Sequence, residues 1–552
     1  MFLVIAVVGL IATIIFGFLQ VVIPFLRGEV KFSKRFPFIT NVRPTTSKDT
    51  ELRPESKGEL SAPREKQEPA RIDLHVSAEG HEAVKSIAVL PFTDISPQKD
   101  QEYFCDGVSE ELINALTKVE DLRVVARTSA FAFKGKTEDI REIGKKLNVK
   151  TVLEGSVRKA GNNLRITAQL INVDDGYHLW SERYDRQMED IFTIQDEISQ
   201  AIVETLKLKL LGEEEAILVK HHTENLEAYN FYLKGRYYWN KRTGESLQRG
   251  IEYFEQAIKK DPGYALAYSG LADCYILLPW YSGLPPKKVV AKAKESAIKA
   301  LELNDTLAEA HTSLAYAMTT HEWDWSGAER EFKRSFGLNP TYATAHQWYA
   351  EYLLYLGRLD EAIAEVERAL ECDPLSLVIN SLMGWLLYAE RRYDQAIEQF
   401  KKTLELDPNF YVANLVIGMT YVQKEMFEEA KKSFQKAKVL SGGATMADAL
   451  LGHAFALVGK KKEARKVLDE LKREAKRMYI PPLDIAVVYV GLNEKDLAFE
   501  WLEKAFEERS IWMIILRVDP IFDNVRSDSR LQDLLRRIYF SDTCHHQNIH
   551  WT

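Results

Sequence analysis

Residues 375–408 read LSLVINSLMGWLLYAERRYDQAIEQFKKTLELDP, and this stretch is one unit of a pattern that repeats every 34 residues. A large apolar residue stands four positions after the alanine of each unit, and prolines such as Pro374 and Pro408 close some of the units. Two amphipathic helices with a small residue at their crossing cannot bury their apolar faces alone, so they must stack on neighbours. The pattern therefore predicts a helical solenoid. The six alanines that keep the spacing are Ala328, Ala362, Ala396, Ala430, Ala464 and Ala498.

The period and the small-residue positions resemble those of the tetratricopeptide repeat (TPR) family. Earlier units are less regular: one ends at Pro262, and the next carries LPWYSGLPP (278–286), an insertion of about nine residues in its turn. We expect about eight repeats over residues 224–512. A capping segment (513–540) and a tail (541–552) follow them.

Length and charge limit the classes of function. A chain of 552 residues is too long for one core, so several parts are expected. The net charge is −8 and the Lys and Arg residues are scattered, which predicts no nucleic-acid partner. The four cysteines are far apart in sequence and form no metal-binding or disulfide spacing.

The first 26 residues, MFLVIAVVGLIATIIFGFLQVVIPFL, contain no charged side chain. At 1.5 Å per residue such a helix would cross a bilayer, so residues 1–26 predict a transmembrane helix with the lipid bilayer as its partner. A cleaved signal peptide is the alternative, but the basic leading segment and the small-residue cleavage site are missing.

Residues 27–83 are rich in proline and polar residues and predict a flexible linker. Cationic residues such as Arg27, Lys31 and Lys34 follow the apolar stretch and none precedes it. The positive-inside rule then predicts a single-pass membrane protein whose soluble part is cytoplasmic, with a periplasmic or other extracytoplasmic location as the alternative.

Residues 84–211 alternate strand and helix patterns. Strands are expected at 86–92 and 122–126, with a helix at 109–119 capped by Asp106 or Ser109 and a helix at 137–147 capped by Thr137. A hairpin around Gly161-Asn162, a third strand and a helix from residue 191 follow. The segments DGVSEELINAL, RTSAFAFKG, LEGSVRKAGNNLRITAQLI, HLWSERYDR and IFTIQDEI together resemble the TolB amino-terminal-like domain. Relatives of this kind often precede TPR arrays in prokaryotic signalling and envelope proteins, and they commonly carry a catalytic or DNA-binding module that this sequence does not show.

No motif for catalysis or for a cofactor occurs: there is no phosphate loop, no H-E-x-x-H, no G-x-S-x-G and no dinucleotide fingerprint. Cys544, His545, His546 and His550 have metal-ligand chemistry, but a short terminus offers no supporting groups to fix a geometry. We therefore expect no catalytic, cofactor or metal site and a non-enzymatic protein.

Resemblance to TPR arrays implies that the first helix of each unit lines a groove that binds a peptide or protein partner. The alternative is that Trp385, Leu415 and Met419 pack internally or against the closing helix. The family's groove positions fall here on Gln347, Glu351, Ser381, Trp385, Tyr388, Leu415, Met419, Ala449 and His453.

The sequence thus predicts an α+β/all-α multidomain protein, with an N-terminal transmembrane helix, a small α/β TolB-like domain and an α-helical TPR solenoid. The leading functional hypothesis is a membrane-anchored scaffold or signalling protein. The other hypothesis is a TolB-like domain that senses a nucleotide or metabolite and is coupled to the TPR array.

Overall fold

The computed structural model describes residues 85–119, 121–206, 222–282 and 284–540. All of these residues belong to one unit, Glu79–Thr552. Within the described ranges no helix is both long and apolar enough to cross a membrane. The predicted fold class, which included a transmembrane helix, is therefore corrected to a helical solenoid with a small α/β region. The expected span (1–26), linker (27–83) and tail (541–552) lie outside the described residues.

The most apolar described helices show the physical basis of this correction. Helix α21 (Pro482–Leu492) is strongly apolar, but its 11 residues reach only about 16 Å, whereas a bilayer core needs about 30 Å. Its side chains are buried by neighbouring helices instead. Apolarity in this chain therefore reflects helix stacking within the described ranges.

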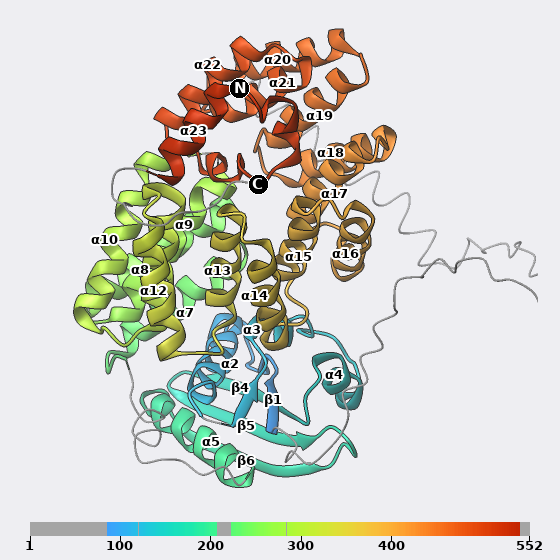
Figure 1. The fold of residues 1–552 in the computed structure, drawn as a ribbon. Coiled ribbons are helices and arrows are strands. Elements are labelled where there is room, and N and C mark those ends of the chain that lie inside the picture. The colour runs from blue at the N-terminus through green and yellow to red at the C-terminus, as the bar shows by residue number, and fades with distance from the viewer. Residues whose placement is uncertain (1–84, 120, 207–221, 283, 541–552) are drawn as a thin grey trace, which may run out of the picture. The chain divides into compact units, whose positions relative to one another are not determined.

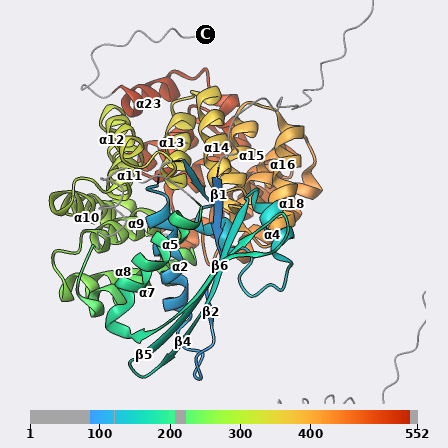
Figure 2. The same ribbon diagram turned by 90° about the horizontal axis from the view of Figure 1, so that it is seen from below.

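The α/β region is built on a mixed sheet in the order β3-β1-β4-β5-β6, with the short β2 (Thr93–Asp94) paired to β4. Strands β1 (Lys85–Val89) and β3 (Leu122–Val124) run parallel, as do β1 and β4 (Thr151–Ala160). β5 (Asn163–Asn172) and β6 (His178–Gln187) extend the sheet in antiparallel pairs. Figure 2 shows the long strands β4, β5 and β6 beside one another. The predicted hairpin turns at Gly161, which has a φ of +60°.

Helices cover both faces of this sheet. Helices α2 (Glu102–Leu116) and α5 (Ile191–Thr205) bury apolar side chains against one face, including Leu112 and Ile198. Helix α4 (Ile140–Leu147) contributes Ile143 and Leu147 to a second cluster, and Phe133, which follows the short α3 (Arg127–Phe131), joins them. Gly144 of α4 lies so close to Val173 that a Cβ there would come within 2.3 Å of its side chain.

Two predicted helix caps are wrong. Helix α2 begins at Glu102, so Asp106 and Ser109 lie inside it; Asp106 is 4% exposed and accepts from Lys134 Nζ at 2.7 Å. Helix α4 is capped by Asp139 rather than Thr137, because the Asp139 carboxylate accepts a hydrogen bond from Arg141 N at 2.9 Å. No side chain caps α2, whose N-terminal residue is preceded by Gln101. For α4 the error arises because Thr137 and Asp139 both precede the apolar run, and the sequence alone does not show which one turns toward the helix end.

After residue 222 the described chain consists of eight consecutive helix pairs that pack side by side (Figure 1). The pairs are α7 (Leu226–Asn240) and α8 (Gly244–Lys260), α9 (Ala265–Ser282) and α10 (Val290–Leu303), α11 (Ala308–Ala317) and α12 (Trp325–Leu338), α13 (Ala343–Tyr355) and α14 (Leu359–Cys372), α15 (Leu377–Ala389) and α16 (Tyr393–Leu406), α17 (Tyr411–Gln423) and α18 (Phe427–Leu440), α19 (Met446–Leu457) and α20 (Lys461–Glu474), and α21 and α22 (Lys495–Glu507).

The 34-residue register is a packing register. All six alanines of the pattern are 0% exposed, and each lies on the second helix of its pair. In the fifth pair the Phe400 ring packs against Gly384 of the first helix, where a Cβ would come within 2.7 Å of that ring. Gly418 and Phe434 repeat this contact one unit later. These two units therefore join their helices through a small residue that faces a large one.

A polar contact repeats with the same period. His346 Nε2 lies 2.8 Å from the carbonyl oxygen of Pro340, and the side-chain amides of Asn380 and Asn414 donate to the carbonyl oxygens of Pro374 and Pro408 at 3.0 Å. In each case the first helix holds the turn that enters it. This contact gives the turn carbonyl a partner that no backbone donor supplies.

Buried ion pairs join the α/β region to the first repeats. Glu110 of α2 accepts from Arg236 of α7 at 2.8 Å and pairs with Arg127 at 2.9 Å. Arg236 also lies 3.5 Å from Asp273 of α9. The two guanidinium groups hold the pKa of Glu110 below its usual range, although burial opposes this shift. The sheet domain is therefore fixed to the array by charges that have little access to water.

The chain ends in the C-terminal segment, residues 511–539, which comprises η4 (Ile511–Ile515), η5 (Pro520–Val525) and α23 (Ser529–Tyr539). Arg537 of α23 pairs with Glu503 of α22 at 2.9 Å. On its other side, Ile538 accepts a hydrogen bond from Trp325 Nε1 of the third pair at 2.9 Å. The C-terminal segment therefore connects the last pair to the third.

Candidate functional site

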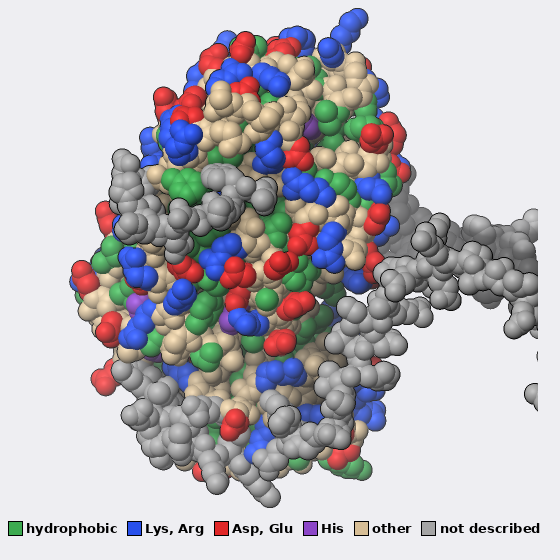
Figure 3. Space-filling model, in the orientation of Figure 1, with side chains coloured by type: hydrophobic (Ala, Val, Ile, Leu, Met, Phe, Trp, Pro, Cys, Tyr) green, Lys and Arg blue, Asp and Glu red, His purple; other side chains and the backbone are tan. Residues whose placement is uncertain are grey.

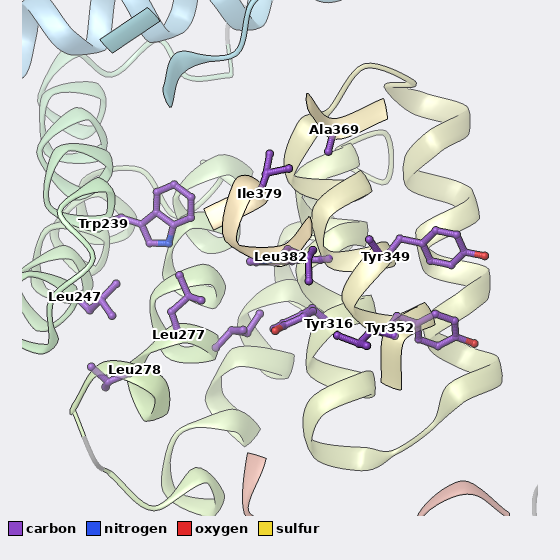
Figure 4. Close-up of a cluster of buried hydrophobic side chains, with 14 of the residues drawn as sticks. Trp239, Leu247, Leu277, Leu278, Tyr316, Tyr349, Tyr352, Ala369, Ile379 and Leu382 are labelled. Atoms are coloured by element: carbon purple, nitrogen blue, oxygen red, sulfur yellow. The ribbon is translucent and has the colours of Figure 1, made fainter. Parts of the chain in front are cut away.

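The first helices of the pairs share one cavity, which we call the inner cavity. Its volume is about 140 Å³, and side chains from α9, α11, α13, α15, α17, α19, α21 and η4 line it. Figure 4 shows Leu277, Tyr316 and Leu382, three lining residues that come from three different helices. The aromatic lining residues are Trp280, Tyr281, Tyr316, Trp348, Trp385, Tyr411, Tyr479 and Trp512.

The nine-residue insertion builds one wall of the inner cavity. It extends α9 through Pro279, so that Trp280 and Tyr281 still belong to the helix and reach the cavity. We did not predict these two residues as site residues. The sequence does contain a signal for these two residues. An insertion that places Trp-Tyr in an otherwise regular repeat marks a position that helix stacking alone does not explain.

The C-terminal segment forms another wall. Trp512 of η4 contacts Trp280 edge-on, with 4.8 Å between ring centroids, and Trp385 at 5.9 Å. The three tryptophans come from parts of the chain that are far apart in sequence. Edge-on and tilted aromatic contacts of this kind favour a fixed geometry, so this wall is set by folding of the whole array.

Two carboxylates line the inner cavity. Glu351 accepts hydrogen bonds from the hydroxyl groups of Tyr316 and Tyr355 and from Gln347 Nε2 at 3.0 Å. Asp484, in the first turn of α21, is 1% exposed and accepts from Thr445 Oγ1 at 2.6 Å through its Oδ2 atom. Its Oδ1 atom has no hydrogen-bond partner among the described residues. Burial raises the pKa of Asp484 to about 7.

The structure separates the predicted groove residues into two groups. Four of them line the inner cavity: Gln347, Glu351, Trp385 and Leu415. The other five are buried and do not line it: Ser381, Tyr388, Met419, Ala449 and His453.

Among the second group, two residues have clear structural partners. Tyr388 donates to Asp519, the N-cap residue of η5, at 2.9 Å, and His453 Nδ1 lies 3.0 Å from the carbonyl oxygen of Val487. Burial lowers the pKa of His453, which favours its neutral form. These side chains hold helices and the C-terminal segment together, and the inner surface is narrower than an open groove.

A second, larger cavity lies where the α/β region meets the repeats. Its volume is about 1010 Å³, and its lining includes Glu111 of α2, Gln195 of α5, Tyr229 of α7 and Glu309 of α11. Burial, and then the neighbouring Glu110, raise the pKa of Glu111 to about 7. Its walls combine charged side chains such as Glu111 and Lys118 with apolar ones such as Leu122 and Phe192, in contrast to the largely aromatic inner cavity.

In the described part of the chain, no group of three or more His, Cys, Asp or Glu side chains has the arrangement of a metal site. The cysteine and histidines of the tail lie outside the described residues. On the face drawn in Figure 3, Lys and Arg side chains alternate with Asp and Glu side chains. The absence of a nucleic-acid partner therefore remains a prediction from the sequence.

Comparisons with known proteins identify two kinds of segment. Residues 83–201 match the family model of the second domain of HilA/YgeH-like transcriptional regulators, rather than a TolB model. Residues 324–376, 379–410 and 411–438 match models of the tetratricopeptide repeat.

The chain is also similar to parts of curated proteins. It is 38% identical over 239 residues to a Rhizobium meliloti (strain 1021) protein named as a candidate adenylate cyclase, a match that covers 43% of this chain and 40% of that protein. It is 25% identical over 253 residues to the transcriptional regulator HilA of Salmonella typhimurium, covering 46% of this chain and 45% of HilA. The chain thus matches less than half the length of either relative.

Among solved structures, the chain is similar to PilF of Pseudomonas aeruginosa. The two chains are 22% identical with a TM-score of 0.30, and the match covers 39% of this chain and 94% of PilF. The repeat matches agree with the helix pairs and with the 34-residue register. The predicted repeats are confirmed: this chain contains tetratricopeptide repeats.

Proposed function

We propose that this chain is a non-enzymatic interaction protein whose TPR array binds a peptide or protein partner at the inner cavity. The observation that carries this proposal is the convergence of first helices from seven of the pairs on one aromatic-lined space. Aromatic side chains are enriched at the centres of protein interfaces because they offer a large rigid surface and a polar edge.

The geometry favours one inserted group over a long bound peptide. A cavity of about 140 Å³ holds one side chain, and the C-terminal segment occupies the space next to it. Met478 and Gly443 line the cavity and are exposed, so a partner can reach it between the turns that precede α19 and α21. The partner would therefore anchor one side chain here and contact the rim with the rest of its surface.

The partial relatives support an accessory role. Their names refer to two different activities, a cyclase and a transcriptional regulator, and each match covers less than half of the relative. A part that occurs in proteins of different activity is suited to binding or relaying rather than to either chemistry.

A quantitative pull-down tests the proposal. The full chain is compared with Trp385→Ala, which removes a cavity wall, and with Trp501→Ala, which removes a half-buried tryptophan of α22 that does not line the cavity. We expect Trp385→Ala alone to lose the bound partner, at least tenfold, while both variants keep their melting cooperativity. Equal loss in both variants, or loss in neither, would reject the inner cavity as the binding site.

A second candidate function is ligand sensing at the larger cavity. Its volume of about 1010 Å³ suits a small metabolite or nucleotide, and Glu111 supplies an Oε1 atom without a hydrogen-bond partner among the described residues. A thermal-shift screen with nucleotides and metabolites tests this candidate, because a ligand that binds only the folded state raises the melting temperature. A shift that Glu111→Gln abolishes would favour sensing, and the absence of any shift would reject it.

A further inference from the structure

The inner cavity has the volume of a single compact chemical group. An engineered protein cavity of about 150 Å³ holds one benzene molecule, so about 140 Å³ accommodates a group of five or six heavy atoms. The eight aromatic residues of the lining make the walls apolar and rich in π faces. The cavity therefore favours a small, weakly hydrated group that can leave bulk water at little cost in free energy.

One wall of this space carries a carboxyl group that has no cationic partner among the described residues. Asp484 is almost fully buried, yet in the described part of the chain it forms no ion pair, and its Oδ1 atom has no donor. The other carboxylate, Glu351, already accepts three hydrogen bonds. A buried carboxylate without a cation or a full set of donors is costly, and such groups are commonly completed by a bound partner.

The surroundings of Asp484 do not supply the missing cation. The groups that face it are the Thr445 hydroxyl, the phenols of Tyr411 and Tyr479, and, at longer range, the carboxylate of Asp448. Asp448 is itself paired with Lys438 at 2.6 Å. Tyr411 lines the same cavity as Asp484, and burial first, and the Asp484 charge second, raise the pKa of its phenol, which stays neutral.

The remaining charge of the cavity is Arg242, which belongs to a different wall. Its guanidinium lies over the ring of Trp239 at 3.9 Å, and its charge acts on Tyr281 and Glu351. Arg242 makes no hydrogen bond to Asp484 Oδ1, which has no partner among the described residues. Glu351 therefore has three donors and the charge of Arg242, whereas Asp484 has one donor and no ionic partner among the described residues.

We propose that the inner cavity binds an organic ammonium group, with Asp484 as its counter-charge and the surrounding aromatic rings as its π-lined walls. Aromatic faces attract a cation through their quadrupole, most strongly where water is excluded, and cages of this kind recognise alkylated ammonium groups. An ammonium of this size combines both requirements of the cavity, because it carries the missing charge and a compact apolar surface. The proposal rests on the proposed function only in its location.

The ammonium group can come from a lysine side chain of the partner or from a free amine. Both sources present the same chemistry to Asp484. Entry runs past exposed Met478 and Gly443 in either case. The cation site is therefore tested first, and the source of the ammonium group second.

The test is calorimetric titration of the full chain with n-butylammonium and with tetramethylammonium. n-Butanol serves as the neutral control and sodium chloride as the ionic-strength control. We expect saturable binding of at least one ammonium, at least tenfold tighter than n-butanol. Asp484→Asn should weaken it at least tenfold, whereas Asp448→Asn, a nearby acid that does not line the cavity, should change it less than about threefold. Equal binding by wild type and Asp484→Asn, or no saturable binding, overturns the proposal.

A second measurement does not depend on any variant. Wild-type binding of tetramethylammonium, whose charge is fixed, should strengthen from pH 5.5 to pH 8 as Asp484 ionises, and a flat profile contradicts the assignment. In the pull-down, displacement of the partner by tetramethylammonium identifies a partner side chain as the source, and binding without displacement identifies a free amine. If Trp385→Ala loses the partner while no ammonium binds, the proposed function stands and the cation site falls.

Discussion

Thr445 donates a hydrogen bond of 2.6 Å to one carboxylate oxygen of Asp484, and the other oxygen has no partner within the described chain. The two residues belong to neighbouring repeats, one in the turn before α19 and the other in α21. If Asp484 served only to stack neighbouring helices, we would expect both of its carboxylate oxygens to be hydrogen-bonded, or an apolar residue in its place. The half-satisfied carboxylate is therefore the feature that packing of the repeats does not explain.

The same carboxylate predicts how stability depends on pH. Burial raises the folded-state pKa of Asp484 to about 7, whereas an unfolded aspartate titrates near about 3.9. The folded state then holds the proton more tightly, so the stability contribution is complete below about pH 4 and is lost as pH rises through about 7. We expect Asp484→Asn to stabilise the protein more at pH 8 than at pH 5, by about 2–4 kcal/mol.

Urea unfolding of the wild type and Asp484→Asn at the two pH values measures this difference. Asp448→Asn is the control, because Asp448 is more exposed and already paired with Lys438. The same stabilisation at both pH values would show that folded Asp484 does not change its protonation state between pH 5 and pH 8, which contradicts a pKa of about 7.

The alanine register predicts a packing cost at Ala396. Replacement by leucine adds three carbons at a helix crossing where the side chain is 0% exposed, so we expect a loss of about 1–3 kcal/mol in unfolding free energy. Neighbouring units should also weaken, because each is stabilised by its stacking partners. Lys401→Ala, on the exposed side of the same helix, should change little. Similar urea melts for the two variants would show that the 34-residue pattern is not a packing register.

Two helical glycines form a matched pair. A Cβ on Gly384 would come within 2.7 Å of the Phe400 ring, whereas a Cβ on Gly337 would meet nothing within 4 Å. Gly384→Ala should therefore destabilise the protein by about 1–3 kcal/mol, and Gly337→Ala should stabilise it by up to about 1 kcal/mol. The double variant Gly384→Ala/Phe400→Leu should recover part of the loss. Additive effects of those two changes would argue against the contact.

Glu110 predicts how the α/β region and the repeats are coupled. Glu110→Gln leaves Arg127 and Arg236 without their shared charge partner, so we expect a loss of about 3 kcal/mol or more. Glu142→Gln, in an exposed pair with Lys145, should cost less than about 0.5 kcal/mol. Calorimetry should show the α/β region unfolding at a lower temperature than the repeats in Glu110→Gln. A single transition at the wild-type temperature would contradict the coupling.

Much of the fold could be predicted because it follows from spacing. The alanines and their large partners such as Phe400 and Phe434 recur at 34 residues, and that period alone sets which helix faces meet. The hairpin was predictable because Gly161 is one of few residues that tolerate a positive φ in a tight turn.

The site was less predictable because it depends on contacts between distant segments. Trp512 and Trp280 are far apart in sequence and meet only after the array has folded. The resemblance to TPR proteins placed Tyr388 in a groove. In the structure, the Tyr388 hydroxyl donates a hydrogen bond to Asp519, the N-cap residue of η5, in the segment that follows the repeats. Asp484 belongs to no sequence motif. Its importance lies in a missing hydrogen-bond partner, which only the three-dimensional structure shows.

The central claim is that the partner enters the inner cavity at its exposed rim. The most direct measurement is photo-crosslinking in cells with a benzophenone amino acid at Met478, which is 46% exposed and lines the cavity, and at Leu406, which is 48% exposed at the end of α16. We predict one discrete crosslinked species from position 478 that disappears with Trp385→Ala, and none from position 406. Crosslinking from 406 alone, or a species from 478 that survives Trp385→Ala, would contradict the account.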